Sequence, residues 1–431
     1  MINGEPFNFH SATGITISNL FRGWPIDKIA QIYSANIKPD NAICKNNWKL
    51  SNSDLLLVSQ YLSIINNHYF VTSHKTTLFY VDKGAIDSSY SRKSLIRRLL
   101  IPWVDLVPYH FSAKFLLWLE EFKPELIYST LGNIRMVNTV QRISRYLSIP
   151  VVPHFMDDWL TTYSVNGKSM VTSLQRAIAR NITGRLLNKV SLGLGICDAM
   201  AAEYGRRYQR RFDAFMNPVE VISDYPVSVK EVTGTMDPVR FVYIGGLHLS
   251  RFENLKDIGN VICSLREEGH NIELHIYAPS GDVMQYESFL TLDNSVRVCG
   301  TLPPNDIQQT LCEYDVAVHV ESFFKKNALY TRLSLSTKIP QYLAAGLPVL
   351  AYGPADVASC RYVGDYECGK VVGERDSKAL SKAIYELASN PELRLQLGRN
   401  SWNVANERHN IHKEQERFRE VLLQVAAESA S

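Results

Sequence analysis

Residues 332–354, RLSLSTKIPQYLAAGLPVLAYGP, decide how the rest of the chain is interpreted. Their pattern predicts a loop, a short helix, a tight turn and a buried strand. Thr337, or Ser336 before it, suits the N-cap of the helix, and Pro340 is tolerated because it falls in the first helical turn. Gly346 closes the helix. The stretch therefore predicts one αβ unit of a parallel α/β sheet.

The start of this helix is also a candidate binding site. It offers unpaired N–H groups and the positive end of the helix dipole. Hydroxyl groups at Ser334, Ser336 and Thr337 and the cation of Lys338 surround it. These groups favour a seat for a phosphate-bearing ligand, and the alternative is an ordinary capped helix with one solvated lysine.

The composition limits the class of protein. A chain of 431 residues is too long for one typical hydrophobic core, so we expect two domains. Hydrophobic residues make up 45% of the chain and charged residues 21%, as in ordinary globular proteins. The formal net charge of +3 and the pI near 8.3 lack the strongly basic signal of a nucleic-acid binder.

The cysteines and the apolar runs indicate in which cellular compartment we expect the protein. The seven cysteines are scattered and never show C-x-x-C spacing, which favours a reduced cytoplasmic protein without a zinc site. The first residues, MINGEPFNFH, do not resemble a secretory signal. No window holds about 18 consecutive apolar residues. We expect a cytoplasmic protein that is either free or peripheral at the inner face of the membrane.

Apolar β-rich runs alternate with segments of helical spacing through the whole chain. Runs that are apolar on both faces predict buried parallel strands covered by helices. Because the second half repeats the rhythm of the first, we predict an α/β protein with two doubly wound, Rossmann-like domains that face a central cleft. The predicted strands are a stub at 2–4, then 126–129, 150–155, 191–196, 214–216, 240–244, 273–278, 295–299, 315–320, 348–352 and 369–372.

The domain boundaries follow from a change in composition. The stretch NPVEVISDYPVSVKEVTGTMDP, residues 217–238, is rich in Pro, Ser, Thr and acidic residues and has no sustained period. We therefore predict a first domain at 1–217, a linker at 218–238 and a second domain at 239–400. A C-terminal helix at 401–431 is expected to pack back on the first domain. In such folds ligands bind at the carboxyl ends of the strands.

Two loops of the second domain carry candidate binding residues. Gly245 and Gly246 end its first strand and allow a bound group to approach the backbone closely. Arg251, just beyond them, offers a bidentate fork to a diphosphate. Glu321 follows another strand and is a candidate for sugar hydroxyls, whereas the lysines next to it fit a solvated loop.

The segment VVPHFMDDW, residues 151–159, follows a predicted strand of the first domain directly. We expect His154, Asp157 and Asp158 to project into the cleft, where an imidazole and two carboxylates can bind sugar hydroxyls or take a proton. One of the two aspartates is alternatively the cap of the next helix. A metal site is disfavoured, because no further ligands follow at a suitable spacing.

A second loop of the first domain holds Ser11, Thr13 and Gly14, where a helix begins. A phosphate or acceptor loop is one interpretation, and a simple N-cap is the other.

Residues 91–103, SRKSLIRRLLIPW, interleave cations with apolar residues. This composition is typical of an interfacial helix attracted to anionic lipid, and the alternative is a solvated helix packed on the sheet. The membrane-facing candidates are Arg92, Lys93, Arg97, Arg98 and Trp103.

Taken together, these segments resemble the GT-B glycosyltransferases, and in particular the retaining family four that includes bacterial surface-polysaccharide enzymes. The resemblance extends over nearly the whole chain and is most specific in STKIPQYLAAGLPVLAYGP. There a Ser/Thr-Lys pair precedes a helix of the form acidic-Tyr-Leu/Met-Ala-x-Gly-x-Pro. The other matching segments are SATGITISNLF, PHFMDDW, CDAMAAEYGRRY with NPVE, and YIGGLHLSRFENL.

The resemblance implies transfer of a sugar from a nucleotide diphosphate sugar to a carbohydrate or lipid-linked glycan acceptor, with retention and without a metal or other cofactor. It places Gly246 and Arg251 at the donor diphosphate. The resemblance also implies that the acceptor or transferred-sugar side holds His154, Asp157 and Asp158. The nucleotide and phosphates are implied to meet Ser336, Thr337 and Lys338, and the ribose is implied to meet Gln341.

The chain departs from the family at two positions. The motif commonly has two glutamates eight positions apart, but here those positions are Leu333 and Gln341. A neutral amide still offers one donor and one acceptor to a ribose, at a loss of roughly 1 kcal/mol of charge-assisted binding. The departure motivates a second hypothesis, a catalytically weak or inactive GT-B scaffold that binds nucleotide sugars. A third is an epimerase or phosphorylase of the same fold.

Overall fold

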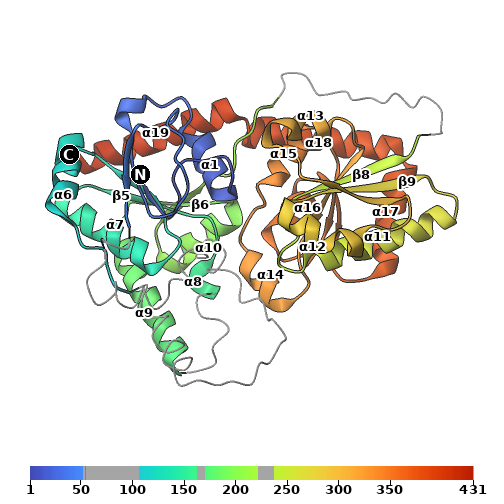
Figure 1. Cartoon of the computed structure of the whole chain (residues 1–431), viewed down its shortest axis with the longest axis horizontal. Coiled ribbons are helices and arrows are strands. Elements are labelled where there is room, and N and C mark those ends of the chain that lie inside the picture. The colour runs from blue at the N-terminus through green and yellow to red at the C-terminus, as the bar shows by residue number, and fades with distance from the viewer. Residues whose placement is uncertain (52–53, 55–105, 163–169, 222–236, 431) are drawn as a thin grey trace. The chain divides into compact units, whose positions relative to one another are not determined.

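The computed structural model describes residues 1–51, 54, 106–162, 170–221 and 237–430 (Figure 1). The chain forms two compact units. The first comprises Met1–Ala214 and Arg419–Ser431, and the second comprises Phe215–Phe418. The last helix, α19 (Ile411–Ala430), thus begins in the second unit and ends in the first. Most of the predicted linker lies outside the described residues.

The first unit is built on parallel strands in two hydrogen-bonded sets, ordered β1-β2-β3 and β4-β5-β6-β7. The sets meet where Thr130 N donates to Asn3 Oδ1 at 2.7 Å and the Ser129 hydroxyl donates to the carbonyl of Ile2. The combined order is that of a doubly wound fold. The strands are β1 (Ile2–Asn3), β2 (Ala30–Tyr33), β3 (Asn46–Lys49), β4 (Ile127–Thr130), β5 (Val151–Phe155), β6 (Leu192–Gly195) and β7 (Arg211–Ala214).

Helices connect most of these strands, as is usual for parallel pairing, whereas residues 34–45 between β2 and β3 form turns. Their N-caps are typical: Ser112 and Asn133 each accept a hydrogen bond from a backbone N–H in the first turn of the helix that follows. The described helices of this unit are α1 (Ala12–Phe21), the 3-10 turn η1 (Ile26–Lys28), α6 (Ala113–Phe122), α7 (Ile134–Leu147), α8 (Trp159–Thr162), α9 (Met170–Leu187) and α10 (Asp198–Tyr208).

The second unit holds one parallel sheet of order β10-β9-β8-β11-β12-β13. The strand order reverses between β8 and β11, so the switch point of this sheet lies there. The strands are β8 (Val239–Ile244), β9 (Ile272–Tyr277), β10 (Val296–Gly300), β11 (Val316–Val320), β12 (Val349–Tyr352) and β13 (Gly369–Val372).

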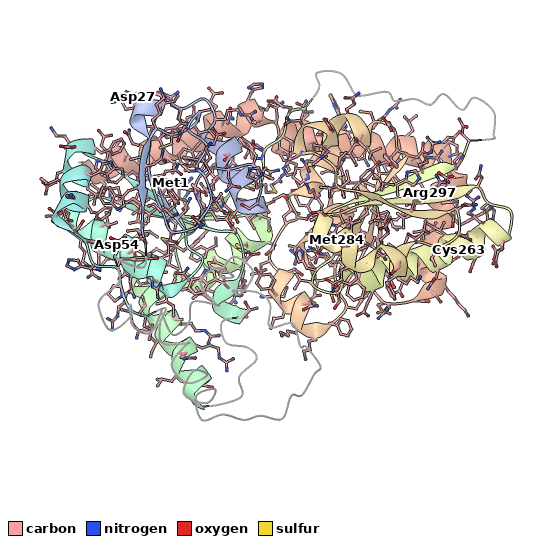
Figure 2. All side chains as sticks on the ribbon, viewed as in Figure 1. Met1, Asp27, Asp54, Cys263, Met284 and Arg297 are labelled. Atoms are coloured by element: carbon pink, nitrogen blue, oxygen red, sulfur yellow. The ribbon has the colours of Figure 1, made fainter. Side chains whose placement is uncertain are left out.

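Side chains fill the space between this sheet and its helices (Figure 2). The core is aliphatic and aromatic, with Phe241, Leu274 and Val318 from the strands and Ile258 and Ile384 from the helices fully buried. The helices are α11 (Arg251–Glu267), α12 (Ser280–Leu290), the 3-10 turn η3 (Pro304–Asp306), α13 (Ile307–Leu311), α14 (Lys325–Thr331), α15 (Lys338–Ala344), α16 (Ala358–Asp365), α17 (Ser377–Ser389), α18 (Pro391–Arg408) and α19.

The prediction of two Rossmann-like units is confirmed, and most predicted strands match within one residue. The last strand of the first unit is wrong by three residues, because Arg211–Ala214 forms it and Phe215 and Met216 begin the second unit. Two strands, β2 and β3, were missed. The strand β3 reads NNWK and is only partly buried at the edge of its set, so it lacks the apolar run that marks a central strand.

The stretch 332–354 folds as predicted, into α15 and β12 joined by a turn at Gly346. Gly346 has a φ of +68°, which is favourable for a residue without a Cβ. At the start of α15, Thr337 occupies the N-cap position but makes no side-chain cap bond. The hydroxyl of Ser336 instead accepts from Lys338 N at 3.4 Å.

One side chain joins α15 to the switch point. The strands β8 and β11 pair only at Phe241 and Val242, and they separate toward their carboxyl ends. There the buried Tyr342 hydroxyl accepts from Ile244 N at 3.0 Å and donates to Ile244 O at 3.2 Å. Tyr342 therefore fixes α15 against the last residue of β8.

Replacing Tyr342 by Phe should destabilise the second unit by about 1–3 kcal/mol, because two buried backbone groups lose this partner. Urea unfolding followed by circular dichroism measures the loss. Tyr385→Phe is the matched control, since the Tyr385 side chain is 43% exposed and its hydroxyl has no hydrogen bond among the described residues. Equal stability of the Tyr342→Phe protein and the control would contradict the assignment.

Candidate functional site

The candidate site of the second unit lies at the carboxyl ends of β8 and β11, where doubly wound sheets bind ligands. Gly245 and Gly246 follow β8 directly, and Arg251 begins α11. Glu321 follows β11 directly. The sequence predicted all four as donor-binding residues, and the structure brings them to the same edge of the sheet.

The loop between Gly245 and Arg251 is held in one conformation by side chains from three elements. Tyr243 donates from its hydroxyl to Gly246 O at 2.7 Å, and Asp282 accepts from Leu247 N at 2.7 Å. Asn327 donates from Nδ2 to Leu249 O at 2.9 Å. Leu249 and the next residue have φ angles of +57° and +60°, a conformation that costs free energy outside glycine and needs such contacts.

A glycine at position 246 has a steric reason. A Cβ atom there would lie 2.5 Å from Nδ1 of His248, which is too close without a shift of the imidazole. The glycine thus makes room for the imidazole of His248, and close approach of a bound group to this backbone stays a prediction.

Arg251 and Glu321 form an ion pair at the centre of this edge. Arg251 Nη2 lies 3.3 Å and 3.4 Å from the two oxygens of Glu321, and His319 Nε2 lies 3.1 Å from Oε1. Both side chains of the pair are largely buried. Glu321 thus orients Arg251, and its carboxylate is engaged within the protein before any ligand binds.

Lys338 provides a second cation at the start of α15. Its backbone is fixed because Ser336 N donates to Ser359 Oγ at 3.1 Å, and Ser359 Oγ donates to Ser334 O at 3.1 Å. Within the described part of the chain, the Lys338 ammonium has no ion pair or hydrogen bond, and burial lowers its pKa. Since α15 has only seven residues, Lys338 supplies more positive potential here than the helix dipole.

Gln341 lies one turn further along α15. Its side-chain oxygen Oε1 is buried and accepts no hydrogen bond from the described residues. A buried acceptor without a donor is costly, so this oxygen is suited to receive a ligand hydroxyl. Because Tyr342 ties the same helix to Ile244, Gln341 belongs to the same edge as Gly246 and Arg251.

The residues of β5 and the loop after it do not lie as predicted. His154 is fully buried within β5, with its Nδ1 2.7 Å from the Tyr128 hydroxyl, instead of projecting from the strand end. Asp158 is also buried. Two nitrogens of Arg207 lie 2.9 Å from its two oxygens, and Tyr204 donates to Oδ1 at 2.9 Å. Asp157 is half-buried, so its side chain is more exposed to solvent than that of Asp158.

The charge of Asp158 is therefore structural. Burial by itself raises the pKa of its carboxyl, but the hydrogen bonds and charge of Arg207 outweigh burial and lower it. The carboxylate connects the start of α8 to α10. The prediction that Asp158 projects into a cleft as a candidate base is wrong, because both of its oxygens are bound inside the first unit.

The loop of Ser11, Thr13 and Gly14 is a helix cap. Ser11 Oγ accepts from Gly14 N at 3.0 Å and donates to a carboxylate oxygen of Glu5. A Cβ atom on Gly14 would lie 2.2 Å from Nδ2 of Asn8, so the glycine serves close packing. Thr13 is half-buried in the first turn of α1. The capping alternative accounts for Ser11 and Gly14, and the phosphate interpretation of this loop gains no support.

Sequence reasoning missed residues that shape the second-unit site. Tyr243, His319, Asp282 and Asn327 were not singled out, although Asp282 stands in the first turn of the helix after β9, where a strand end could have drawn attention to it. The others lie within strands or helices, and their roles depend on contacts distant in sequence. The membrane candidates Arg92, Lys93, Arg97, Arg98 and Trp103 lie outside the described residues.

Comparison with known families agrees with this geometry. Residues 238–390 match the family described as "Glycosyl transferases group 1". The chain carries a glycosyltransferase domain. The matched region contains β8 to β13 and the edge that holds Arg251, Glu321 and Lys338. The prediction of a glycosyltransferase enzyme is thereby confirmed. No curated protein sequence matches the chain.

Solved structures extend the likeness to the whole fold. Sucrose-phosphate synthase from Thermosynechococcus elongatus has a TM-score of 0.61 at 13% identity, over 100% of this chain and 99% of its own. HepE of Anabaena, in complex with UDP and glucose, has a TM-score of 0.59 at 12% identity, over 98% of each chain. The alpha,alpha-trehalose 6-phosphate synthase of Burkholderia multivorans has a TM-score of 0.59 at 10% identity, over 100% of this chain and 99% of its own. The GT-B architecture is thus confirmed.

The ion pair of Arg251 and Glu321 should appear in the pH dependence of stability. Burial raises the pKa of Glu321, but the charge of Arg251 and the hydrogen bond from His319 outweigh it and lower the pKa to about 2. A carboxyl with a lower pKa in the folded state stabilises the fold above its unfolded pKa of about 4.3. This stabilisation is lost as the pH falls toward 2.

We therefore expect Glu321→Gln to lower the free energy of unfolding by about 3 kcal/mol near pH 6, and by about half of that at pH 3. Denaturant unfolding of both proteins from pH 6 to pH 3 measures the difference, and the contributions of other groups cancel. Glu267→Gln on the same helix as Arg251 is the control, because Glu267 is exposed and has no ion pair among the described residues. A difference that stays constant with pH would contradict the charged pair.

Proposed function

We propose that this glycosyltransferase moves a sugar from a nucleotide diphosphate sugar to a carbohydrate or lipid-linked glycan acceptor. The observation that carries the proposal is the pair of cations, Arg251 and Lys338, at one edge of the second-unit sheet, with Lys338 lacking a partner among the described residues. Two cations at the same edge as a glycine pair suit a diphosphate. HepE, whose structure holds UDP and glucose, has the same fold and supports this choice of donor.

The rest of the edge suits the other parts of such a donor. Oε1 of Gln341, which has no partner among the described residues, can accept a hydrogen bond from a ribose hydroxyl. Ser336 and Thr337 are half-buried beside Lys338 and present hydroxyl groups to the phosphates. Gly245 and Gly246 allow the diphosphate to approach the loop before α11.

The reaction breaks the bond between the anomeric carbon and the diphosphate and forms a bond from that carbon to an acceptor oxygen. Negative charge develops on the leaving diphosphate, and Arg251 and Lys338 stabilise it electrostatically. We propose that this makes a divalent metal unnecessary. We also propose retention, in which the departing phosphate oxygen takes the proton of the acceptor hydroxyl. If the reaction inverts, Asp157 becomes the candidate base, because Asp158 is bound to Arg207.

The family-level proposal is a retaining enzyme of the family-four type that acts in surface-polysaccharide synthesis. Its support is the match of PHFMDDW and STKIPQYLAAGLPVLAYGP to the family pattern. A cytoplasmic location with peripheral contact at the membrane agrees with a lipid-linked acceptor. Among the described helices, none combines the length and apolar character needed to cross a bilayer.

A catalytically weak or inactive nucleotide-sugar scaffold is the second candidate function. The specific observation is Leu333, which occupies the position of the first family glutamate and is 5% exposed, with Gln341 at the second. A buried leucine offers no hydrogen bond to a transferred sugar. The scaffold and the transferase make the same prediction for donor binding but opposite predictions for turnover.

A panel of nucleotide sugars tests the proposed function. We expect one donor to raise the melting temperature and to be consumed, slowly with water and faster with a glycan acceptor. Lys338→Met should weaken donor binding by about tenfold or more, since one charge-assisted contact is worth roughly 1.5–3 kcal/mol. Lys382→Met is the control, because Lys382 is 78% exposed on α17. Stabilisation without turnover would favour the scaffold, and neither effect with any donor would contradict both.

Gln341 decides how the ribose is held. Replacement by Leu should weaken binding of the free nucleoside diphosphate by about fivefold, because a ribose hydroxyl loses an acceptor worth about 1 kcal/mol. Gln341→Glu should bind at least as tightly as the wild type, since it restores a charge-assisted bond. Isothermal titration calorimetry gives the dissociation constants. Unchanged binding by Gln341→Leu would exclude Gln341 from the donor site.

A further inference from the structure

Two adjacent helices of the first unit have an unusual charge pattern. The sequence of α9 contains Arg176, Arg180 and Arg185 and no carboxylate, and that of α7 contains three arginines and no carboxylate. The two helices pack together, and Gln141 of α7 donates from Nε2 to Ile182 O of α9 at 2.9 Å. They lie side by side in Figure 1.

The cations of these helices differ in where they point. Two arginines of α7 are used inside the unit: Arg135 donates from Nε to Val107 O at 3.1 Å, and Arg142 stacks on Phe111 at 4.1 Å. The others remain at the surface. We define the basic face as Arg145 of α7, Arg176, Arg180 and Arg185 of α9, and Lys189 just after it.

The basic face differs from the next helix in its ion pairs. Within the described part of the chain, none of its five cations forms an ion pair; Arg145 donates only to Gln141, and Arg176 only to Ser173. The next helix behaves differently. On α10, Arg206 pairs with Glu203, and Arg207 pairs with Glu203 and Asp158. Among the described residues, carboxylates thus neutralise the arginines of α10 but not the cations of the basic face.

Helix dipoles explain only part of this pattern. Arg145 and Arg185 stand in the last turns of α7 and α9, where a cation offsets the negative helix end. Arg176 and Arg180 lie in the first and middle parts of α9, where the dipole effect has faded. A cavity of about 600 Å³ lies at the ends of the two helices, beside Ser429 of α19. Arg145, Arg185 and Lys189 line it, and no carboxylate side chain is among the described residues of its lining.

The exposed side of α9 is also partly apolar. Leu174 is 52% exposed, and Ala177, Arg180, Asn181 and Arg185 follow it at helical spacing on the exposed side. The opposite side is buried, through Ala179, Leu186 and Leu187 in particular. An exposed leucine beside small residues and cations is the composition of a helix that lies on an anionic bilayer.

The position of α9 in the fold relates such a membrane contact to the carboxyl edge of the first-unit sheet. The helix leads from the carboxyl end of β5 back to the amino end of β6, and its 18 residues span about 27 Å, against about 17 Å for β5. The short helix α8, which follows the loop of Asp157 at the carboxyl edge of the sheet, contacts α9. A bilayer along α9 would lie next to the edge where loops of this unit carry Asp157.

We propose that the basic face is a docking surface for a membrane rich in anionic phospholipid. Its cations bind lipid phosphates, the cavity between α7 and α9 accepts a headgroup, and Leu174 enters the interface. The surface holds the carboxyl edge of the first unit beside a lipid-linked acceptor. That last step rests on the proposed function, whereas binding to lipid is independent of it.

Vesicle sedimentation tests the proposal without donor or acceptor. The full-length protein should bind vesicles of 30% phosphatidylglycerol in phosphatidylcholine, bind pure phosphatidylcholine vesicles at least tenfold more weakly, and dissociate from the anionic vesicles in 0.5 M salt. Arg180→Gln with Arg185→Gln should weaken partitioning about 30-fold, since each cation near an anionic surface contributes about 1 kcal/mol. Leu174→Ser should weaken binding to the anionic vesicles at low salt, because the interface loses an apolar contact.

Lys382→Gln with Arg399→Gln in the second unit is the matched control, since both cations are exposed and the change in net charge is the same. It should bind like the wild type. Equal loss in the control, unchanged binding by the Arg180 and Arg185 variant, or binding to heparin but not to vesicles would each overturn the proposal. Donor turnover, measured in detergent, should be unchanged in the Arg180 and Arg185 variant. Failure of vesicle binding is thereby distinguished from failure of the proposed function.

Discussion

The site of the second unit depends on the separation of β8 and β11. Parallel strands whose order reverses send their connecting helices to opposite faces, so the carboxyl ends at the switch point are not bridged by a crossover. The ladder between β8 and β11 holds only at Phe241 and Val242. Tyr342 satisfies the backbone of Ile244 beyond that point, and in doing so it fixes α15 beside the opening. One phenol group thus serves both the sheet and the site.

The two cations at this edge differ in their contacts within the protein. Arg251 is held by Glu321, which in turn lies near His319, so its guanidinium is oriented before a ligand arrives. Lys338 has no such partner among the described residues, and burial lowers its pKa. A preorganised guanidinium loses little entropy when it binds, and an uncompensated ammonium gains most from an incoming anion. Together they suit a leaving group whose charge increases during the reaction.

The arginines of the first unit also fall into two groups, those with a carboxylate partner and those without one among the described residues. Asp158 and Glu203 engage the arginines of α10: Glu203 pairs with them within the helix, and Asp158 connects the start of α8 to α10 through Arg207. The arginines of the basic face have no such partners among the described residues, although three of them belong to α9, the helix immediately before α10. Proximity in sequence therefore does not decide whether a cation is structural. Among the described residues, the two groups of arginines differ in whether a carboxylate lies within reach, either on the same helix or on a neighbouring element.

The sequence by itself determined the periodic and local features of this protein. Apolar runs at β5, β8 and β11 revealed the parallel sheets because central strands bury both faces, and Gly346 marked the end of α15 because its backbone has a positive φ. The polar edge strand β3 escaped detection for the same reason, since it buries little. The candidate residues Arg251 and Lys338 could be named because each follows a strand or begins a helix.

Only the tertiary structure decided what those side chains contact. The sequence suggested that His154 and Asp158 are reactive groups at a strand end. In the structure His154 contacts Tyr128, which is 26 positions away. Asp158 contacts Tyr204 and Arg207, which are 46 and 49 positions away. The sequence pattern around Tyr342 is that of an ordinary core aromatic residue, yet its hydroxyl bonds to Ile244, 98 positions away. Local pattern fixes which elements form, because it depends on backbone period. The partner of a buried polar group depends on how those elements pack, and no local pattern contains that information.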